Sequence, residues 1–368
     1  MKIVFGHHAF TMQRYGGISR YFHELSSHIS KSGNHNVEIF APVFDNAFLA
    51  NRGDSSITGW NVPRVPGTNF ARQPLNNLVS RLVLRGRHDV DIYHETYYSI
   101  PDLGPASAKR IVTVYDMIHE LSPERFTATD NTRVAKQTAM DRADHIICIS
   151  DNTRSDLMRL TRVPRSKLSV IHLACAAPIE NRAIAVLPFR TRPYILFVGQ
   201  RASYKNFNAL LHGYASSSVL RSAVAMVCFG GGEFTDEERS LFRSLLLGEH
   251  DVVHCSGDDR MLAALYSSAA AFVYPSLYEG FGIPTLEAMS LGCPVVCSNT
   301  SSLPEVVGDA AELFDPHQPT DMISAIEHVL MDRVRSQQLV ASGYARVQQF
   351  SWEKCARETV AVYEQVLA

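Results

Sequence analysis

The sequence carries almost no excess charge of either sign. Its 368 residues include 35 Lys and Arg against 37 Asp and Glu, a formal net charge of −2. A chain this close to neutral has no overall field that would attract nucleic acid, so we expect no nucleic-acid partner. The halves differ, because residues 1–180 hold 21 basic and 17 acidic side chains. The first half is therefore better suited to an anionic partner than the second half.

The sequence also lacks the marks of several protein classes. Its seven cysteines are an odd number, lie mostly in apolar runs and show no zinc-binding spacing, which predicts buried, reduced thiols. The longest uncharged stretch, 261–278, divides into a helix and a strand rather than forming a membrane span. The chain enters a strand pattern without a secretory leader, so we expect a cytoplasmic protein.

Short apolar runs alternate with amphipathic segments along the whole chain. Apolar runs that are each followed by a helical segment are typical of parallel sheets, which predicts the α/β class. The alternation restarts after a proline-punctuated stretch near 178–193, so we predict two Rossmann-like, doubly wound domains. The expected strands lie within 2–5, 37–42, 91–94, 110–116, 145–150, 169–173, 194–199, 224–230, 251–257, 271–276 and 294–298.

This alternation predicts three parts of the chain. Residues 1–180 form the first domain, and residues 181–350 form the second. Residues 351–368 form a final helix that crosses back onto the first domain. Ser351 is a plausible N-cap for that helix, because it precedes the helical pattern directly.

The strongest local signal is the segment SLYEGFGIPTLEAMSLGCPVV at 276–296. Glu279 lies in a Gly-rich turn that opens a helix, and we place Glu287 in the first helical turn. Carboxylates accept hydrogen bonds from sugar hydroxyls, and the amides of a helix N-terminus favour a phosphate or a developing oxyanion. If both carboxylates only stabilised the helix, the glycines at the same corner would be unexplained. The amides expected to face the anion are those of Gly280, Phe281, Gly282 and Ile283.

This segment resembles the E-x7-E signature of the retaining glycosyltransferases of family 4, and further segments resemble that family's motifs in the same order. The resemblance covers most of the chain. The sequences of these motifs are similar to those of bacterial mannosyl- and rhamnosyltransferases of surface polysaccharide assembly. This resemblance implies the GT-B fold, in which two Rossmann-like domains face a cleft, with the acceptor bound by the first domain (1–180) and the nucleotide-sugar donor by the second (181–350). The other segments are YGGISRYFHEL (15–25), HETYY (94–98), TVYDMIHE (113–120), ADHIICISDNT (143–153), FVGQRASYKN (197–206), SGDDRMLAALYSSAAAFVYPSLYEGFG (256–282) and LPEVVGDAA (303–311).

The resemblance implies roles for residues of the second half. Arg201 and Lys205 would clamp the donor's diphosphate just beyond the first strand of the second domain; the alternative is an ordinary pair of surface cations. Glu287 would hold the nucleoside ribose, and Glu279 would contact the transferred sugar. The two cations and the amides of 280–283 would stabilise the departing diphosphate.

In the first half the resemblance places Gly16 and Gly17 close to the donor phosphates and the acceptor, with a plain tight turn as the alternative. The family often has a histidine where Tyr115 falls in this chain. His119, four residues later, takes that role if the loop bends, with Tyr115 or Asp116 also facing the sugar. The alternative is a structural role for His119.

We expect no metal and no other cofactor beyond the nucleotide-sugar substrate. Asp89-Val90-Asp91 matches the D-x-D metal pattern of a different glycosyltransferase fold, but it leads directly into an expected strand. Arg201 and Lys205 already supply the positive charge that a divalent ion would bring to the leaving diphosphate. The acidic pair is therefore interpreted as ordinary.

The segment ARQPLNNLVSRLVLRGRH at 71–88 is expected to form a basic amphipathic helix. Its leucines and valines recur at helical spacing between arginines, a pattern that can lie on an anionic leaflet. The alternative is a packed helix with a solvated basic face. An anionic membrane is thus a candidate partner, reached at the inner face of the cytoplasmic membrane.

The resulting hypothesis is a retaining, metal-independent hexosyltransferase. It favours mannose or rhamnose from a GDP-sugar as the donor and a lipid-linked saccharide of O-antigen or another surface polysaccharide as the acceptor. No nucleophilic carboxylate is obvious in the first half, so the resemblance implies displacement on the front face of the sugar. The alternatives are a UDP-sugar-dependent transferase of the same fold, a nucleotide-sugar epimerase, and a non-catalytic nucleotide-sugar-binding subunit.

Overall fold

The chain folds into two compact units in this computed structural model. The first unit comprises Met1–Leu173 together with Trp352–Ala368, and the second comprises Ala174–Ser351. The predicted boundary at residue 180 and nearly all of the proline-punctuated stretch lie outside the described residues. The residues that the structure describes are 1–50, 57–64, 69–175, 192–201 and 203–368.

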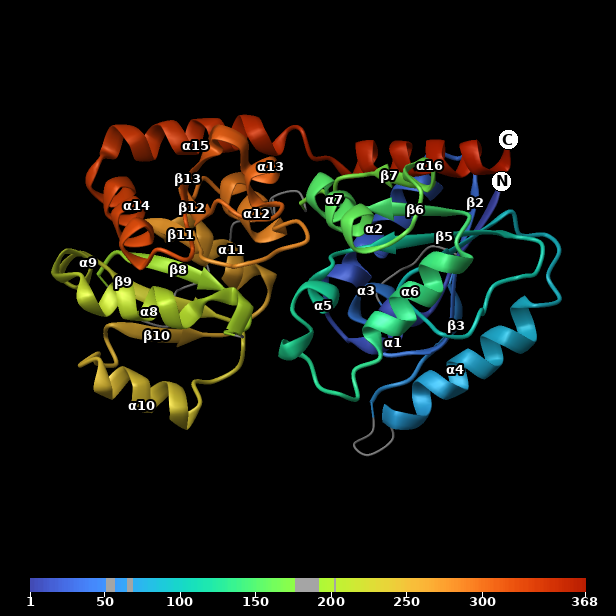
Figure 1. Cartoon of the computed structure of the whole chain (residues 1–368), viewed down its shortest axis with the longest axis horizontal. Coiled ribbons are helices and arrows are strands. Elements are labelled where there is room, and N and C mark those ends of the chain that lie inside the picture. The colour runs from blue at the N-terminus through green and yellow to red at the C-terminus, as the bar shows by residue number, and fades with distance from the viewer. Residues whose placement is uncertain (51–56, 65–68, 176–191, 202) are drawn as a thin grey trace. The chain divides into compact units, whose positions relative to one another are not determined.

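The first unit is built on a seven-stranded parallel sheet in the order β3-β2-β1-β4-β5-β6-β7 (Figure 1). Strands are added outward from β1 in one direction and from β4 in the other, so the switch point of the sheet lies between these two strands. The strands are β1 (Lys2–Phe5), β2 (Asn36–Phe44), β3 (Ile57–Asn61), β4 (Ile92–Glu95), β5 (Lys109–Val114), β6 (His145–Cys148) and β7 (Leu168–Val170).

Helices pack on this sheet, and the last helix of the chain is one of them. Helix α16 lies beside α2, and Tyr363 Oη is 2.6 Å from His94 Nδ1 in β4. His94 Nε2 lies 2.9 Å from Thr113 Oγ1, so buried polar contacts tie α16 to the centre of the sheet. The helices are α1 (His8–Met12), α2 (Gly17–Lys31), α3 (Ala47–Ala50), α4 (Asn69–Leu84), α5 (Ile118–Leu121), α6 (Thr132–Arg142), α7 (Asp151–Leu160) and α16 (Trp352–Leu367), with 3₁₀ turns η1 (Pro123–Arg125) and η2 (Arg165–Lys167).

The second unit is built on a six-stranded parallel sheet in the order β10-β9-β8-β11-β12-β13, with its switch point between β8 and β11. Its core includes Phe197, Tyr214 and Met226, all buried. The strands are β8 (Tyr194–Val198), β9 (Ala225–Phe229), β10 (Val252–Cys255), β11 (Ala271–Tyr274), β12 (Val295–Ser298) and β13 (Ala311–Phe314). The helices are α8 (Phe207–Ser216), α9 (Ser218–Ala223), α10 (Asp236–Ser244), α11 (Asp259–Ser268), α12 (Ile283–Ser290), α13 (Leu303–Val307), α14 (Pro319–Met331) and α15 (Arg333–Val347), with 3₁₀ turns η3 (Ser203–Lys205) and η4 (Gly308–Ala310).

The predicted pair of Rossmann-like domains is confirmed, and each predicted run overlaps a strand. Two strands were not predicted, β3 and β13, and each lies at an edge of its sheet. All seven cysteines are buried thiols outside any disulfide, as expected. Among the described residues, no helix has both the length and the apolar character needed to cross a bilayer.

Candidate active site

A lysine and a glutamate form a close ion pair at the switch point of the second sheet. Lys205 ends the 3₁₀ turn η3 that follows β8, and its Nζ lies 2.6 Å from Glu279 Oε1. The same Nζ donates a hydrogen bond of 3.0 Å to the hydroxyl of Tyr274, the last residue of β11. Because β8 and β11 are the two strands at which the sheet reverses direction, this pair lies where open α/β sheets bind ligands.

The electrostatics of this pair keep Lys205 charged. Burial alone would lower the pKa of Lys205, but the neighbouring Tyr274 hydroxyl and Glu279 carboxylate outweigh burial and raise that pKa above its ordinary value. Burial and the Glu279 charge also raise the pKa of Tyr274, so the hydroxyl stays protonated. The side chains of Lys205 and Glu279 remain 13% and 12% exposed, so both can still be reached by a ligand.

The turn from Glu279 to α12 is fixed by the loop that follows β12. The Glu279 amide donates to Ser301 Oγ at 2.9 Å, and the Ser302 hydroxyl donates to the carbonyl oxygens of Glu279 and Phe281. Gly282 adopts a φ of 102°, and a Cβ added there would lie 2.6 Å from Leu303 Cδ2. Glycine is therefore required at this position for both its backbone conformation and its lack of a side chain.

One detail of the predicted turn needs correction. Helix α12 begins at Ile283, so Glu287 is its fifth residue and lies in the second helical turn, not the first. Beyond the predicted amides, the helix start offers no further free N–H at the next two positions, because Pro284 has none and the Thr285 amide is bonded to the Gly282 carbonyl. The predicted contacts of Gly280, Phe281, Gly282 and Ile283 with a phosphate, and of Glu287 with a ribose, stay predictions.

Arg201 is bound to the chain itself in this structure. Its guanidinium forms a bidentate pair with Glu238, with Nε 2.6 Å from Oε1, and is 4% exposed. It also donates to the carbonyl oxygens of Gly230, Gly232 and Glu233. Nη1 and Nη2 thus have acceptors within the loop that follows β9, and Nε and Nη2 are bound by Glu238 of α10 (Asp236–Ser244). The predicted contact of Arg201 with a diphosphate stays a prediction, whereas its role in holding this loop is directly visible.

The backbone conformation of that loop explains why it contains three consecutive glycines. Gly230, Gly231 and Gly232 adopt φ values of 82°, 73° and 75°, a left-handed run that other residues rarely adopt. A Cβ at Gly231 would lie 2.9 Å from Arg201 Nη1, so the loop curls closely around the guanidinium. The partner of Arg201 was missed: Thr235 and Glu238 form an S/T-x-x-E capping box at the start of α10, a signal that marks the helix start but not the ion pair.

The glycine pair of the first unit lies at a helix start. Helix α1 separates Gly16 and Gly17 from β1, and Gly16 is the N-cap of α2 with an extended backbone. A Cβ at Gly16 would collide with the side chain of Gln13, whereas one at Gly17 would meet nothing within 4 Å. Neither glycine has a positive φ, so local geometry favours a capping role. Their contact with donor phosphates stays a prediction.

The structure separates the three first-unit candidates for the sugar site. Tyr115 is buried and its hydroxyl donates to the Thr96 carbonyl at 2.7 Å, so this hydroxyl is engaged inside the unit. His119 stacks on Phe126 with ring centroids 3.8 Å apart, and its Nε2 lies 3.5 Å from Asp130 Oδ2. Asp116, which follows β5, keeps 34% of its side chain exposed. The proposed catalytic role of His119 stays a prediction.

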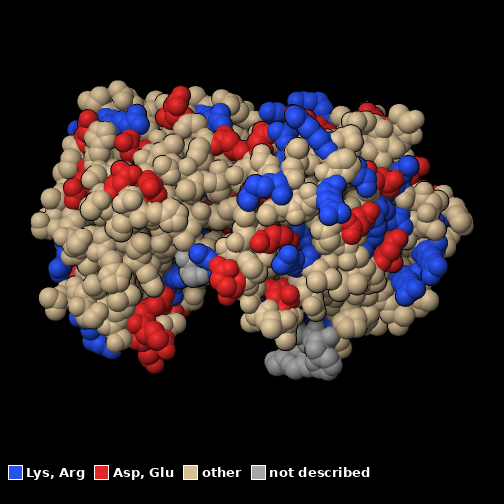
Figure 2. Space-filling view, viewed as in Figure 1, with Lys and Arg blue, Asp and Glu red and all other residues tan. Residues whose placement is uncertain are grey.

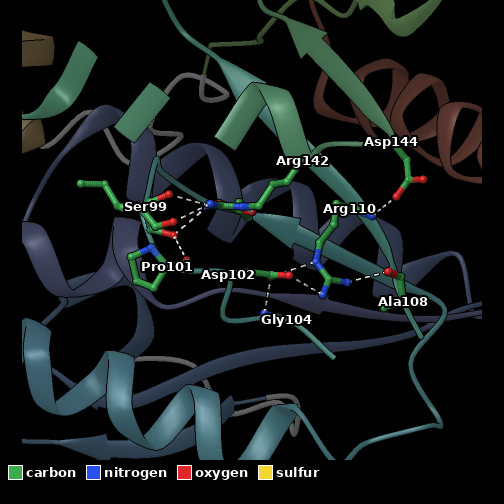
Figure 3. A network of polar contacts seen from close by, with 10 residues as sticks. Ser99, Pro101, Asp102, Gly104, Ala108, Arg110, Arg142 and Asp144 are labelled. Carbon is green, nitrogen blue, oxygen red and sulfur yellow. Dashed lines mark hydrogen bonds and ion pairs between the residues drawn. The ribbon is translucent and has the colours of Figure 1, made fainter. Parts of the chain in front are cut away.

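A buried ion pair at the switch point of the first sheet was missed by sequence reasoning. Glu95, the last residue of β4, forms a bidentate pair with Arg142, with Oε1 2.7 Å from Nε. Arg142 also donates to the carbonyl and hydroxyl oxygens of Ser99 (Figure 3). The signal was present in HETYY, where a charged residue ends a buried strand, but its partner lies 47 positions away. This pair fixes the loop after β4.

Two stacked histidines lie at the same switch point. His7 and His8 follow β1, are buried, and stack with ring centroids 4.1 Å apart. Burial lowers the pKa of His7 to about 4, although its hydrogen bond with Asn77 of α4 opposes the shift. Burial also lowers the pKa of His8, and the charges of His7 and Arg142 lower it further. Both rings are therefore neutral at pH 7.

The acidic pair discounted as a metal site lies at the opposite edge of the first sheet. Asp89 pairs with Lys2 at 2.6 Å and with Arg87 at 3.0 Å, and the Asp91 carboxylate accepts the Lys2 amide. These residues precede β4 and adjoin the start of β1, so they lie where the strands begin. Their partners give them a structural role.

Comparison with known proteins agrees with this architecture. A family model described as "Glycosyl transferases group 1" matches residues 180–346, and one described as "Glycosyltransferase Family 4" matches residues 15–175. O-antigen chain mannosyltransferase B of Escherichia coli is 34% identical over a 288-residue alignment that covers 74% of each chain. The serotype-specific mannosyltransferase WbdA of Escherichia coli is 29% identical over a 278-residue alignment that covers 70% of this chain and 34% of WbdA.

A solved structure extends the likeness over nearly the whole chain. WaaG, a glycosyltransferase involved in lipopolysaccharide biosynthesis, matches with a TM-score of 0.73 at 15% identity, covering 98% of this chain and 99% of WaaG. The two parallel sheets, each with a polar site at its switch point, therefore have the arrangement of the GT-B fold. The chain belongs to the family 4 glycosyltransferases, and it is a hexosyltransferase.

Proposed function

We propose that this enzyme transfers mannose or rhamnose from a GDP-sugar, with retention of anomeric configuration, to a lipid-linked saccharide during the synthesis of O-antigen or a similar surface polysaccharide. The observation that carries the proposal is the Lys205–Glu279 pair at the switch point of the second sheet, beside the turn at Gly282. A cation there suits a diphosphate and a carboxylate suits sugar hydroxyls. The 34% identical O-antigen chain mannosyltransferase B supports the choice of sugar and pathway.

The proposed reaction proceeds on one face of the sugar. The bond from the anomeric carbon to the diphosphate oxygen breaks as the acceptor oxygen bonds to the same face of that carbon. The acceptor's hydroxyl proton passes to the departing diphosphate. Lys205 would stabilise the negative charge that develops on the diphosphate, and Glu279 would hold the transferred sugar by its hydroxyls. Stabilisation of the leaving group is then the main source of rate acceleration.

Titration calorimetry with GDP, UDP and ADP in the presence of a chelator tests the donor. We expect GDP to bind most tightly, and Lys205→Ala to weaken that binding while the exposed Lys31→Ala leaves it unchanged. Transfer from GDP-mannose should fall by about 10²- to 10³-fold in Lys205→Ala.

Preference for UDP would move the donor to UDP-sugars, and a need for Mg²⁺ or Mn²⁺ would contradict metal independence. Binding without transfer or donor hydrolysis would instead indicate a non-catalytic subunit, and release of epimerised donor an epimerase.

A lipid-linked acceptor places the reaction at the inner face of the cytoplasmic membrane. The surface that supports this proposal is α4, which covers most of the predicted segment 71–88. Leu75, Leu78 and Leu82 on this helix are 47%, 57% and 72% exposed. Exposed leucines beside arginines suit a peripheral contact with an anionic leaflet.

A further inference from the structure

Helix α4 packs against the first sheet with its polar side. Asn76 and Ser80 are fully buried, and the Asn76 side chain both accepts from the Val43 amide and donates to the Val43 carbonyl at 2.8 Å. Asn76, Ser80 and the buried Leu84 recur every four residues and so share one face. Leu78 and Leu82 lie on the opposite face, exposed. Val79 and Leu84 still pack in the core, but Leu78, Leu82 and most of the apolar stripe are exposed, the reverse of an ordinary surface helix, which buries its stripe.

The arginines of this segment divide into two pairs. Arg72 donates to the carbonyl oxygens of Val62 and Pro63, and Arg87 pairs with Glu38 at 2.8 Å and with Asp89, so both hold the fold together.

The second pair is Arg81 and Arg85. Both are exposed, and neither forms an ion pair or a hydrogen bond with the described part of the chain. They are four positions apart at the end of α4 and lie on the side that carries Leu78 and Leu82. Figure 2, in the same view as Figure 1, shows basic atoms gathered near the end of this helix, at the lower right.

These two free arginines line a hollow of about 300 Å³ against the loop that follows β4. The opposite wall is formed by residues 101–106 and by Arg110, near the start of β5. Arg110 is held by a bidentate pair with Asp102, each contact being 3.1 Å (Figure 3). The one carboxylate of the wall is therefore neutralised by its own arginine. Arg81 and Arg85 therefore give the hollow a net positive charge.

We propose that this hollow binds the phosphate of an anionic phospholipid headgroup, with Arg81 and Arg85 as the ligating cations. The inference rests on the proposed function only in that a lipid-linked acceptor brings the enzyme to a membrane. Arginine suits phosphate because its planar fork donates two parallel hydrogen bonds. A bilayer is favoured over a soluble phosphate because large apolar side chains are exposed close in the chain to the arginines or to the wall of the hollow. Leu78 and Leu82 share their side of α4, and Ile100 precedes the wall residue Pro101; they are 57%, 72% and 51% exposed and can enter the acyl region.

The hollow is distinct from the edge of the first sheet that bears His7 and Glu95. Arg110 is the second residue of β5, and residues 101–106 lead into that strand, so the hollow adjoins the edge where the strands begin. Parallel α/β sheets bind their substrates at the other edge, where the strands end. The arginine pair therefore contacts the membrane without occupying the substrate-binding edge of this sheet.

Vesicle sedimentation with the full chain tests the site. The vesicles contain phosphatidylcholine alone or phosphatidylcholine with phosphatidylglycerol, and the variant is Arg81→Gln/Arg85→Gln. The matched control is Arg239→Gln/Arg243→Gln, which removes two exposed arginines four positions apart on α10 of the second unit. Each cation near an anionic surface strengthens binding about fivefold, so we expect the variant to lose about 30-fold in affinity for the anionic vesicles. The control should bind like the unmodified protein.

Three results would overturn the proposal. The first is equal binding of the variant and the control to anionic vesicles. The second is binding that does not depend on phosphatidylglycerol. The third is a calorimetric signal with inorganic phosphate that the variant abolishes while its vesicle binding persists, because the ligand would then be a soluble phosphate. Sedimentation requires no donor, so it tests this site independently of the proposed function. A protein that binds vesicles but no nucleotide would contradict the proposed function and still support the phospholipid site.

Discussion

At the scale of single residues, the Lys205–Glu279 pair sets the charge of the second-unit site. The two groups lie 2.6 Å apart and are nearly enclosed, so each depends on the other for its charged state. A ligand that brings a diphosphate to Lys205 also frees Glu279 to accept hydrogen bonds from hydroxyls. The pair is thus suited to exchange one internal contact for two contacts with a donor.

Substitution of Glu279 by glutamine tests this pairing. Glutamine keeps the size of the side chain but removes its charge, so we expect the protein to stay folded and transfer to fall by about 10²-fold or more. Steady-state transfer assays measure the loss, and Glu249→Gln, at an exposed position, serves as the control. Activity within a fewfold of the unmodified enzyme would show that Glu279 does not contact the sugar.

Buried histidines predict an acid-sensitive fold. Burial lowers the pKa of His7 to about 4 and that of His94 to about 3. An unfolded histidine titrates near 6.5, so above that pH both states are neutral and stability is complete; below it only the unfolded state gains the proton. We therefore expect stability to fall from pH 6.5 towards pH 4, with His7 alone contributing about 3 kcal/mol.

Urea denaturation between pH 7.5 and 4 measures this loss. His7→Gln should reduce the pH dependence, whereas the exposed His88→Gln should leave it unchanged. A stability that rises on acidification would contradict the assignment of neutral histidines.

At the scale of elements, most of the fold could be predicted from sequence because central parallel strands are short apolar runs. The two missed strands lack that signature: β3 is ITGWN with mostly exposed positions, and β13 is AELF with a central glutamate. Edge strands are covered less, so their composition is mixed. The reversal of α4 could not be predicted either, since periodicity finds an apolar stripe without saying which side packs.

The same limit applies to the site. Lys205, Glu279 and Arg201 were found because motifs and glycines mark them, and Lys205 and Glu279 prove to be in contact. Glu95 and Arg142 escaped because their pairing depends on the tertiary fold alone. Sequence can indicate which residues are chemically suited to a site, but it cannot show which of them already have partners, as Arg201 does in Glu238.

Helix α16 gives a prediction at this scale. Tyr363→Phe removes the hydroxyl that lies 2.6 Å from His94 Nδ1 and leaves a buried ring nitrogen without that partner. We expect a loss of about 1–3 kcal/mol in the free energy of unfolding. Urea denaturation of the variant against Tyr15→Phe, at an exposed tyrosine, measures it. An unchanged midpoint would show that the contact contributes nothing to the docking of α16.

At the scale of the whole molecule, the two units have separate sheets and separate cores, and the Lys205–Glu279 pair proposed to hold the donor belongs to the second. A nucleotide that binds only the folded second unit stabilises that unit by about 2.7 kcal/mol at a hundredfold excess over Kd. We expect calorimetric scans with GDP to raise the transition of the second unit and leave that of the first in place. A shift of both transitions together would indicate that the units unfold as one.

The membership of α16 in the first unit has a consequence for synthesis. The ribosome completes the whole second unit before it makes Trp352–Leu367, although these residues pack beside α2 from the start of the chain. The first unit must therefore wait, with the site of α16 uncovered, while about half the protein is still being translated. A nascent chain arrested before residue 352 would expose Tyr21 and His94 to chaperones, and the first unit closes only after α16 has been made.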